Sequence, residues 1–125
     1  LEPVEDVEVI VIGGLLRKGF QCTINHGTAS LLTMISVDKA FLGTNAFSLQ
    51  KGASSPDFSQ AEMKRQMITI ASKVIILCDH TKLETNSFMG FATADEIDLL
   101  ITDRISPEFR EKYEEAGIQV STFQE

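Results

Sequence analysis

The chain of 125 residues is predicted to form one α/β domain with a mostly parallel sheet. Short apolar runs alternate with segments of helical character along the chain, and strands separated by helices of this length imply βαβ units. Residues 74–78 (VIILC) are too short and β-branched for a helix and show no polar alternation. This pattern is typical of a central parallel strand that is covered on both faces.

A strand and a short helix are predicted near the amino terminus. Residues 7–12 (VEVIVI) are expected to form the strand, which ends at Gly13 and Gly14. Residues 28–35 follow as a helix because their apolar side chains share one face. A second strand is expected over residues 38–42 and ends at Gly43, Thr44 and Asn45. A loop of about fifteen residues rich in Gly, Ser and Pro comes next, and loops of that length are often functional.

The sequence signals for the following helix lie at its start. Ser59 and Glu62 match a capping box, and Phe58 with Met63 matches a hydrophobic staple. Apolar residues at helical spacing should form the buried face, namely Met63, Met67, Ile70 and Ala71. Three neighbouring polar residues should form the solvated face, namely Lys64, Arg65 and Gln66.

The carboxyl-terminal part is predicted to add two strands and two helices. Thr93 and Glu96 repeat the capping-box pattern for a one-turn helix, and residues 99–102 form a short strand that ends at Asp103. Ser106 and Pro107 start the last helix as N-cap and first helical residue, and Gly117 ends it. The expected buried stripe of this helix is Phe109, Tyr113 and Ala116. Residues 119–122 close the chain as a strand.

Composition excludes several classes of function. The net charge of −7 argues against nucleic-acid binding by this chain itself, because such binding depends on Lys and Arg neutralising phosphates. No apolar run is long enough to span a membrane, and no signal-peptide pattern opens the chain. Two cysteines without metal spacing and two histidines predict reduced thiols in a cytoplasmic protein, with no metal site and no cofactor.

The strand ends predict a binding site. In a parallel sheet, residues 13–14, 43–45, 79–82 and 102–103 should meet at one edge, where open α/β sheets bind ligands. Lys82 is suited to an anion, while Asp79 and Asn45 offer the groups that sugar hydroxyls need. Arg17 is interpreted either as a phosphate ligand or as a solvated charge. The alternative for the whole edge is a set of surface turns in which these residues only solvate strand ends.

Catalysis has weaker support in the sequence. No close acid–base pair is identifiable, and Asp79 is the only candidate for a base. A nucleophilic pair of Cys78 and His80 is conceivable, but neighbouring side chains at a strand end should diverge. Asp103 is interpreted as a cap or turn residue.

Four segments, taken together and in order, resemble the effector-sensing domain of DeoR-type transcriptional repressors. They are VEVIVIGGLLR, DKAFLGTNAFSLQKGASSPD, AEMKRQMITIASKVIILCDHTKL and IDLLITD. The resemblance implies a Rossmann-like three-layer fold, similar to that of sugar-phosphate isomerases, glucosamine-phosphate deaminases and CoA-transferases. It also implies a non-enzymatic sensor that binds a phosphorylated sugar, forms homo-oligomers and contacts DNA only through an N-terminal winged helix-turn-helix outside this chain. The alternative is a sugar-phosphate isomerase or deaminase of the same fold.

The resemblance also assigns roles to individual residues. Lys82, in the D-x-x-K match, would contact the phosphate or sugar, and Asp79 would hold a hydroxyl or position Lys82. The other expected ligand-binding residues are Gly43, Thr44 and Asn45 along the sugar, and Gly13, Gly14 and Arg17 on the opposite side. Asn45-Ala46 stands where the family usually has Asn-Gly. The chain starts at Leu1, so the domain is expected to be truncated before a phosphate-cradling turn that the family has upstream.

Overall fold

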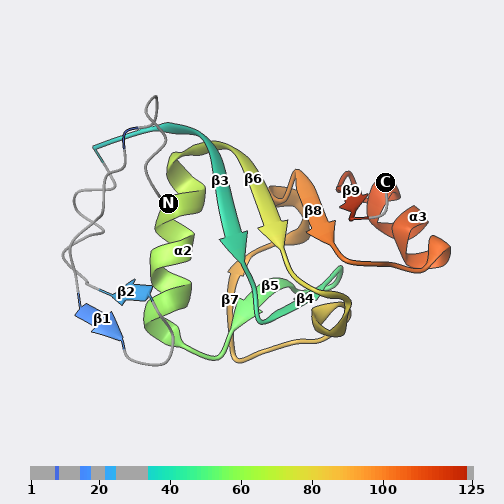
Figure 1. The fold of residues 1–125 in the computed structure, drawn as a ribbon, viewed down its shortest axis with the longest axis horizontal. Helices are drawn as coiled ribbons and strands as arrows, with labels where there is room; N and C mark the ends of the chain where they lie inside the picture. Colours follow the sequence, from blue (N-terminus) through green and yellow to red (C-terminus); the bar gives the residue numbers. More distant parts are fainter. Residues whose placement is uncertain (1–7, 9–14, 18–21, 25–33, 124–125) are drawn as a thin grey trace.

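The computed structural model of the chain describes residues 8, 15–17, 22–24 and 34–123 (Figure 1). Apart from Glu8, the predicted strand over residues 7–12 lies outside these residues, as do most of the predicted helix over residues 28–35 and both Gly13 and Gly14. Two short strands, β1 (Leu15–Arg17) and β2 (Cys22–Ile24), pair antiparallel. Residues 34–123 form the continuous part of the described structure.

The main sheet is parallel throughout, as the alternation of strands and helices predicts. Its strands are β3 (Val37–Gly43), β6 (Ala71–Leu77), β8 (Leu99–Thr102) and β9 (Gln119–Thr122). They hydrogen-bond in the order β3-β6-β8-β9, so β6 is an internal strand. Val74, Ile75 and Ile76 are all buried, which confirms the interpretation of the VIILC run as a central strand.

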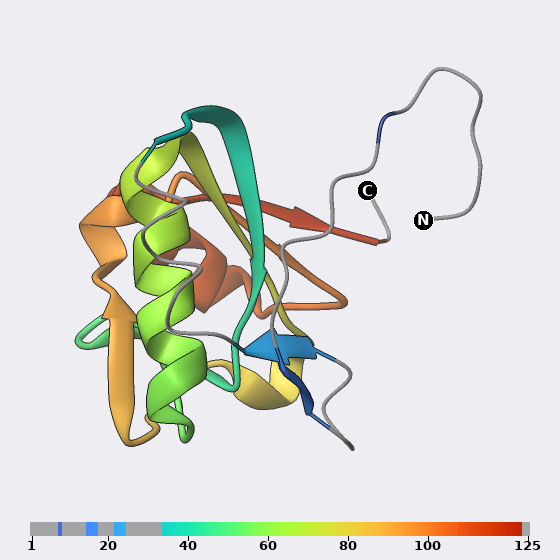
Figure 2. The same cartoon turned by 90° about the vertical axis from the view of Figure 1, so that its left-hand side faces the viewer.

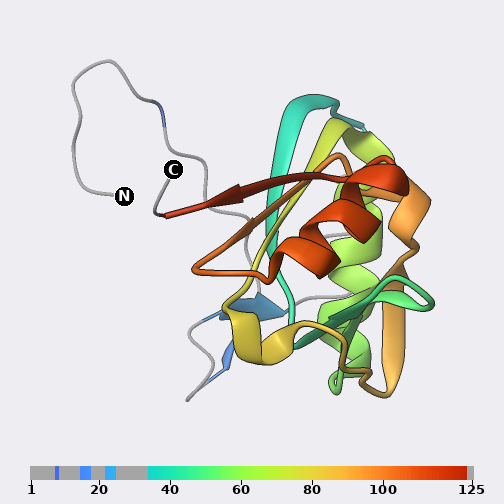
Figure 3. The ribbon, with the colours of Figure 1, turned by 90° about the vertical axis from the view of Figure 1, so that its right-hand side faces the viewer.

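Two helices, α2 (Phe58–Ile70) and α3 (Pro107–Glu115), lie on the same side of this sheet (Figures 2 and 3). One buried cluster joins Ile68 of α2 and Tyr113 of α3 to a single face of the sheet. Adjacent strands place Leu42, Ile76 and Leu100 side by side on that face. The hydrophobic core of the described residues therefore lies between the sheet and the two helices.

The helix boundaries correct two predictions. Asp57, rather than Ser59, is the N-cap of α2, because its carboxylate accepts hydrogen bonds from the backbone N–H groups of Ser59 and Gln60. In α3, Ser106 caps Phe109 as predicted, and Gly117 after the helix has φ +95°. Ala116, predicted to be in the buried stripe, is exposed because the helix ends at Glu115.

The long loop predicted after β3 is wrong in its main feature, because it contains a hairpin. β4 (Ala46–Ser48) and β5 (Gly52–Ser55) pair antiparallel, and β7 (Met89–Ala92) adds to β5 as a third strand. Every residue of β4 and β5 is buried, and Phe47 is completely so. This small sheet lies against α2.

Two 3₁₀ turns complete the described part. η1 (His80–Lys82) follows β6 and was not predicted, while η2 (Ala94–Glu96) carries the predicted Thr93–Glu96 capping box. No helix in the portion that the structure describes is both long and apolar enough to cross a membrane.

Candidate functional site

The carboxyl ends of β6 and β8 meet, as the parallel topology predicts. The backbone N–H of Cys78 donates to the carbonyl of Ile101 at 3.1 Å, and the N–H of His80 donates to Oδ1 of Asp103 at 2.7 Å. β3 pairs with β6 in the same direction, so Gly43 ends beside Leu77. The structure thus brings three of the predicted strand ends to one edge.

Lys64 of α2, which was predicted on the solvated face of the helix, is partly exposed and also reaches this edge. Its Nζ donates to the carbonyl of Gly43 at 2.8 Å. Arg65 is exposed, as predicted, and its guanidinium pairs with Glu96 and donates to the carbonyl of Phe91. These two cationic side chains of α2 therefore contact solvent and also connect the helix to β3, β7 and η2.

Asp79 and Lys82 lie at the two ends of η1. The Asp79 carboxylate caps the turn by accepting from the N–H and the hydroxyl of Thr81. The hydrogen bond from the Thr81 side chain is the main reason that the pKa of Asp79 is lowered, so the group is ionised at neutral pH and is a poor base. Lys82 is half-buried, and no side chain among residues 34–123 forms an ion pair with it.

The last residue of β3, Gly43, and the two residues that follow it differ in accessibility. The Thr44 hydroxyl is buried and lies 2.7 Å from the carbonyl of Ala46 and 3.1 Å from that of Ser54, so it joins the strand end to the hairpin. Asn45 and Gly43 are exposed, and open space lies where a Cβ on Gly43 would point. Arg17 lies in β1, its side chain is outside the described part, and Gly13 and Gly14 are outside it altogether.

A hydrogen-bonded chain of Asp103, His80 and Arg104 was missed by sequence reasoning. His80 Nδ1 lies 2.8 Å from Asp103 Oδ2, and His80 Nε2 lies 3.0 Å from Arg104 Nη2. The hydrogen bond with His80 lowers the pKa of Asp103 to about 2, so the carboxylate is ionised. Asp103, interpreted from the sequence as a cap or turn residue, accepts from the His80 N–H through one carboxylate oxygen and contacts the His80 ring through the other.

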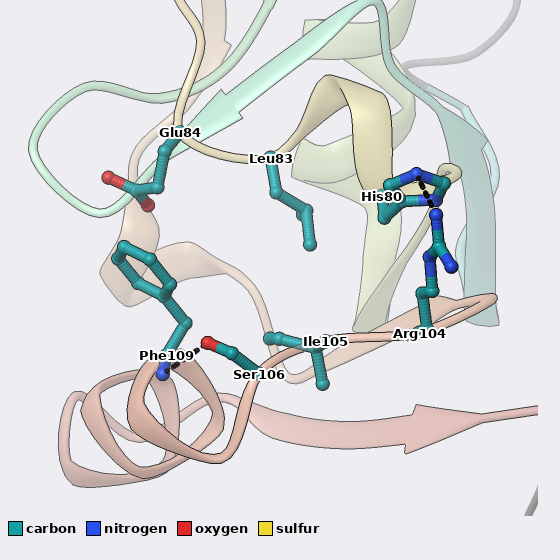
Figure 4. Close-up of a pocket in the computed structure, with 7 residues that line it drawn as sticks. All are labelled: His80, Leu83, Glu84, Arg104, Ile105, Ser106 and Phe109. Carbon is teal, nitrogen blue, oxygen red and sulfur yellow. Dashed lines mark hydrogen bonds between the residues drawn. The ribbon is translucent and has the colours of Figure 1, made fainter.

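A pocket of about 500 Å³ opens between η1 and the start of α3 (Figure 4). The residues that line it are His80, Leu83, Glu84, Arg104, Ile105, Ser106 and Phe109. None of the eight predicted ligand-binding residues is among them. Within the described residues, no three His, Cys, Asp or Glu side chains come together in a way that could hold a metal ion.

Cys78 is not a nucleophile paired with His80. The His80 ring contacts Asp103 and Arg104, and burial raises the pKa of the Cys78 thiol to about 11.

In a Cys22→Ala background, Cys78 should react with a thiol reagent at neutral pH about a hundredfold more slowly than free cysteine. Stopped-flow labelling tests this, with the urea-unfolded protein as the control for an accessible thiol. Equal rates in the folded and unfolded protein would contradict the assignment.

The lowered pKa values of two carboxyl groups make the stability of the fold depend on pH. The hydrogen bond from Arg65 holds the pKa of Glu96 at about 2, as the His80 bond does for Asp103. Both pKa values lie below the value of roughly 4 expected in the unfolded chain, so these groups stabilise the fold above about pH 5 and lose that effect as pH falls towards about 2. Glu96→Gln or Asp103→Asn should flatten the fall in melting temperature across that range. A slope equal to that of the exposed control Glu111→Gln would disprove it.

Comparison with known proteins decides the family. Residues 1–104 match the DeoR C terminal sensor domain. The chain belongs to the DeoR family. The match confirms the resemblance seen in the four sequence segments, and it ends before Ile105, so α3 and β9 lie beyond it.

Curated relatives of this DeoR sensor domain are transcriptional regulators. The chain is 38% identical over 117 residues to the HTH-type transcriptional regulator GlpR of Haloferax volcanii. The aligned region covers 93% of the chain and 46% of GlpR. It is 38% identical over 101 residues to the HTH-type transcriptional repressor GlcR of Bacillus subtilis. This aligned region covers 81% of the chain and 39% of GlcR. The chain thus spans less than half the length of these relatives, and they are regulators rather than enzymes.

Proposed function

We propose that this DeoR sensor domain binds a phosphorylated sugar at the edge formed by the carboxyl ends of β3, β6 and β8. The observation that carries the proposal is the Lys82 ammonium, which has no ion-pair partner among residues 34–123 and stands in the D-x-x-K segment. A lysine at the carboxyl end of a parallel strand is well placed to contact a phosphate. It is notable in a chain whose net charge is −7, because most of the surface would repel such a ligand.

The neighbouring groups support a sugar beside the phosphate. The Asp79 carboxylate, which accepts a hydrogen bond from the Thr81 N–H in the turn that carries Lys82, can also accept from a sugar hydroxyl. The exposed Asn45 adds an amide just after the end of β3. The open space at Gly43 gives a ligand close access to the backbone, and Lys64 fixes the carbonyl of that residue. In this proposal Thr44 shapes the loop along the sugar, while Gly13, Gly14 and Arg17 close its other side.

The regulatory mechanism follows from linkage. A sugar phosphate that binds two states of the regulator with different affinity shifts the population between them. If only one state favours the operator, the ligand changes the affinity for DNA by the same factor by which DNA changes the affinity for the ligand. In this proposal the DNA-binding domain lies outside this chain, the regulator is a cytoplasmic homo-oligomer, and the sensor does not turn its ligand over.

Loss of the Lys82 ammonium should weaken binding. Lys82→Ala is expected to raise the dissociation constant of the sugar phosphate by roughly 10- to 150-fold, because a hydrogen bond to a charged group contributes about 1.5–3 kcal/mol. A thermal-shift screen of sugar phosphates, with free sugars as controls, identifies the ligand, and calorimetry then compares the variants.

A matched control separates the site from general charge. Lys73→Ala removes one cation from the exposed amino end of β6, at the opposite edge of the sheet, and should leave binding unchanged. If Lys82→Ala binds as tightly as the parent, or if free sugars shift the melting temperature as much as their phosphates, the assignment fails.

A further inference from the structure

The pocket between η1 and α3 has a cationic end and an apolar wall. Arg104 and His80 lie together at one end, whereas Leu83, Ile105 and Phe109 line the space between that end and Glu84 (Figure 4). Arg104 is exposed, and no carboxylate among the described residues forms an ion pair with its guanidinium. The positive charge at the mouth is therefore available to a ligand.

The two hydrogen bonds of the His80 ring explain how Arg104 is oriented. Because Asp103 is ionised, the hydrogen between it and His80 Nδ1 belongs to the ring. In a neutral imidazole the other nitrogen, Nε2, is then an acceptor, and it accepts from Arg104 Nη2 at 3.0 Å. Arg104 uses one of its five N–H groups in this contact, and no other acceptor among the described residues bonds to its guanidinium, so the remaining donors can bind a carboxylate or phosphate.

We propose that this pocket binds a small organic anion with an apolar body, at a site separate from that of the sugar phosphate. The anionic head would lie on Arg104 and the apolar body on Leu83, Ile105 and Phe109. A bare sugar fits poorly, because these three side chains offer no hydrogen bonds to its hydroxyls. The volume of about 500 Å³ lies within the usual range for small-molecule sites.

Glu84 does not oppose this assignment. Its Oε2 accepts a hydrogen bond from the Tyr113 hydroxyl at 2.7 Å, so the carboxylate is held on α3 at the far end of the pocket. Glu84 also has φ +56°, a backbone conformation that residues other than glycine rarely adopt. One end of the pocket is therefore positive, at Arg104, and the other is negative, at Glu84. This arrangement favours the ligand orientation in which the anionic head lies on Arg104.

Calorimetric titration with model anions tests the proposal. The probes are hexanoate, hexyl phosphate and uncharged hexanol, each titrated up to about 10 mM, which detects dissociation constants in the millimolar range. At least one anion should bind saturably and at least about tenfold more tightly than hexanol, because the alcohol loses the charge-assisted contact. Comparison of the two anions identifies the preferred head group.

Variants locate the site and separate it from the proposed sugar-phosphate site. Arg104→Ala should weaken the anion about tenfold or more, whereas Lys73→Ala and Lys82→Ala should leave it unchanged. His80→Leu should weaken binding in the parent but have no further effect in the Arg104→Ala background, because His80 acts through Arg104 as a positioning residue.

Two results would overturn the proposal. One is the absence of saturable binding by either anion, and the other is parental affinity in Arg104→Ala. Neither result bears on the sugar-phosphate site, because that site is tested by Lys82→Ala with sugar phosphates. Conversely, a failed sugar-phosphate screen would leave the organic-anion test intact.

Discussion

Replacing Gly52 with alanine is expected to lower the free energy of unfolding by about 2–5 kcal/mol. Gly52 has φ +77°, a region that costs other residues about 1–2 kcal/mol. A Cβ at this position would also lie 1.9 Å from the Ala92 carbonyl oxygen, so β5 and β7 would have to separate. Overpacking of this kind adds about 1–3 kcal/mol. Urea unfolding followed by circular dichroism measures the loss, which is a large part of a typical total of about 5–15 kcal/mol.

Two other glycines separate the backbone strain from the clash. Gly117 also has a positive φ, +95°, but a Cβ at this position would meet no atom within 4 Å, so Gly117→Ala should show the strain alone. Gly43 has neither a positive φ nor a neighbour within 4 Å, and Gly43→Ala should change stability by no more than about 0.5 kcal/mol. Equal losses at Gly52 and Gly117 would show that β5 and β7 do not approach as closely as described. Weaker sugar-phosphate binding by the stable Gly43→Ala variant would place that residue in the site.

The parts of the fold that sequence predicted are those determined by local signals. The VIILC run specified an internal strand because it lacks polar alternation, and β6 is internal in the sheet. Ser106 and Pro107 specified the start of α3, and Gly117 its end. In each case the responsible side chains lie within a few residues of the feature, so no tertiary information was needed.

The small antiparallel sheet could not be predicted in the same way. β4 and β5 are three and four residues long, and apart from Phe47 they consist of Ala, Ser and Gly. Their buried hydroxyl groups find partners in distant segments, because Ser48 Oγ bonds to Asn86 and Ser54 Oγ accepts from the N–H of Ser87. The N-cap of α2 was misplaced by two residues, since Asp57 and Ser59 are both good capping residues.

The candidate site also has features that the sequence predicted and features that only the tertiary structure shows. The convergence of strand ends followed from parallel topology, which the sequence pattern supports. The contact between His80 and Asp103 depends on the register of β6 with β8, and nothing in the sequence specifies that register. A histidine just after one strand and an aspartate just after the next were the only available signals. Their pairing, and the role of Arg104, required the structure.

Replacing Phe47 with alanine should destabilise the fold strongly and should also weaken ligand binding in the pocket. Its ring is fully buried and packs edge-on against Tyr113, with centroids 5.4 Å apart and an interplanar angle of 85°. Loss of a buried Phe side chain costs about 3–5 kcal/mol, which lowers the melting temperature of a domain of this size by more than about 10 °C. The exposed Phe88, with 80% of its surface accessible, is the matched control, and Phe88→Ala should change stability by no more than about 0.5 kcal/mol.

The effect of Phe47 on the pocket follows from its backbone contacts. β4 bridges to Leu83 through Phe47, and the Phe47 carbonyl accepts from the N–H of Thr85 at 3.1 Å. The segment that carries Leu83 and Glu84 is therefore held by β4 on one side and by Tyr113 on the other. Phe47→Ala removes the ring that joins these two supports, so organic-anion binding should weaken even at temperatures where the variant is folded. Unchanged affinity in the folded variant would show that the pocket does not depend on this packing, whereas an unchanged unfolding midpoint in urea would contradict the burial of Phe47 itself.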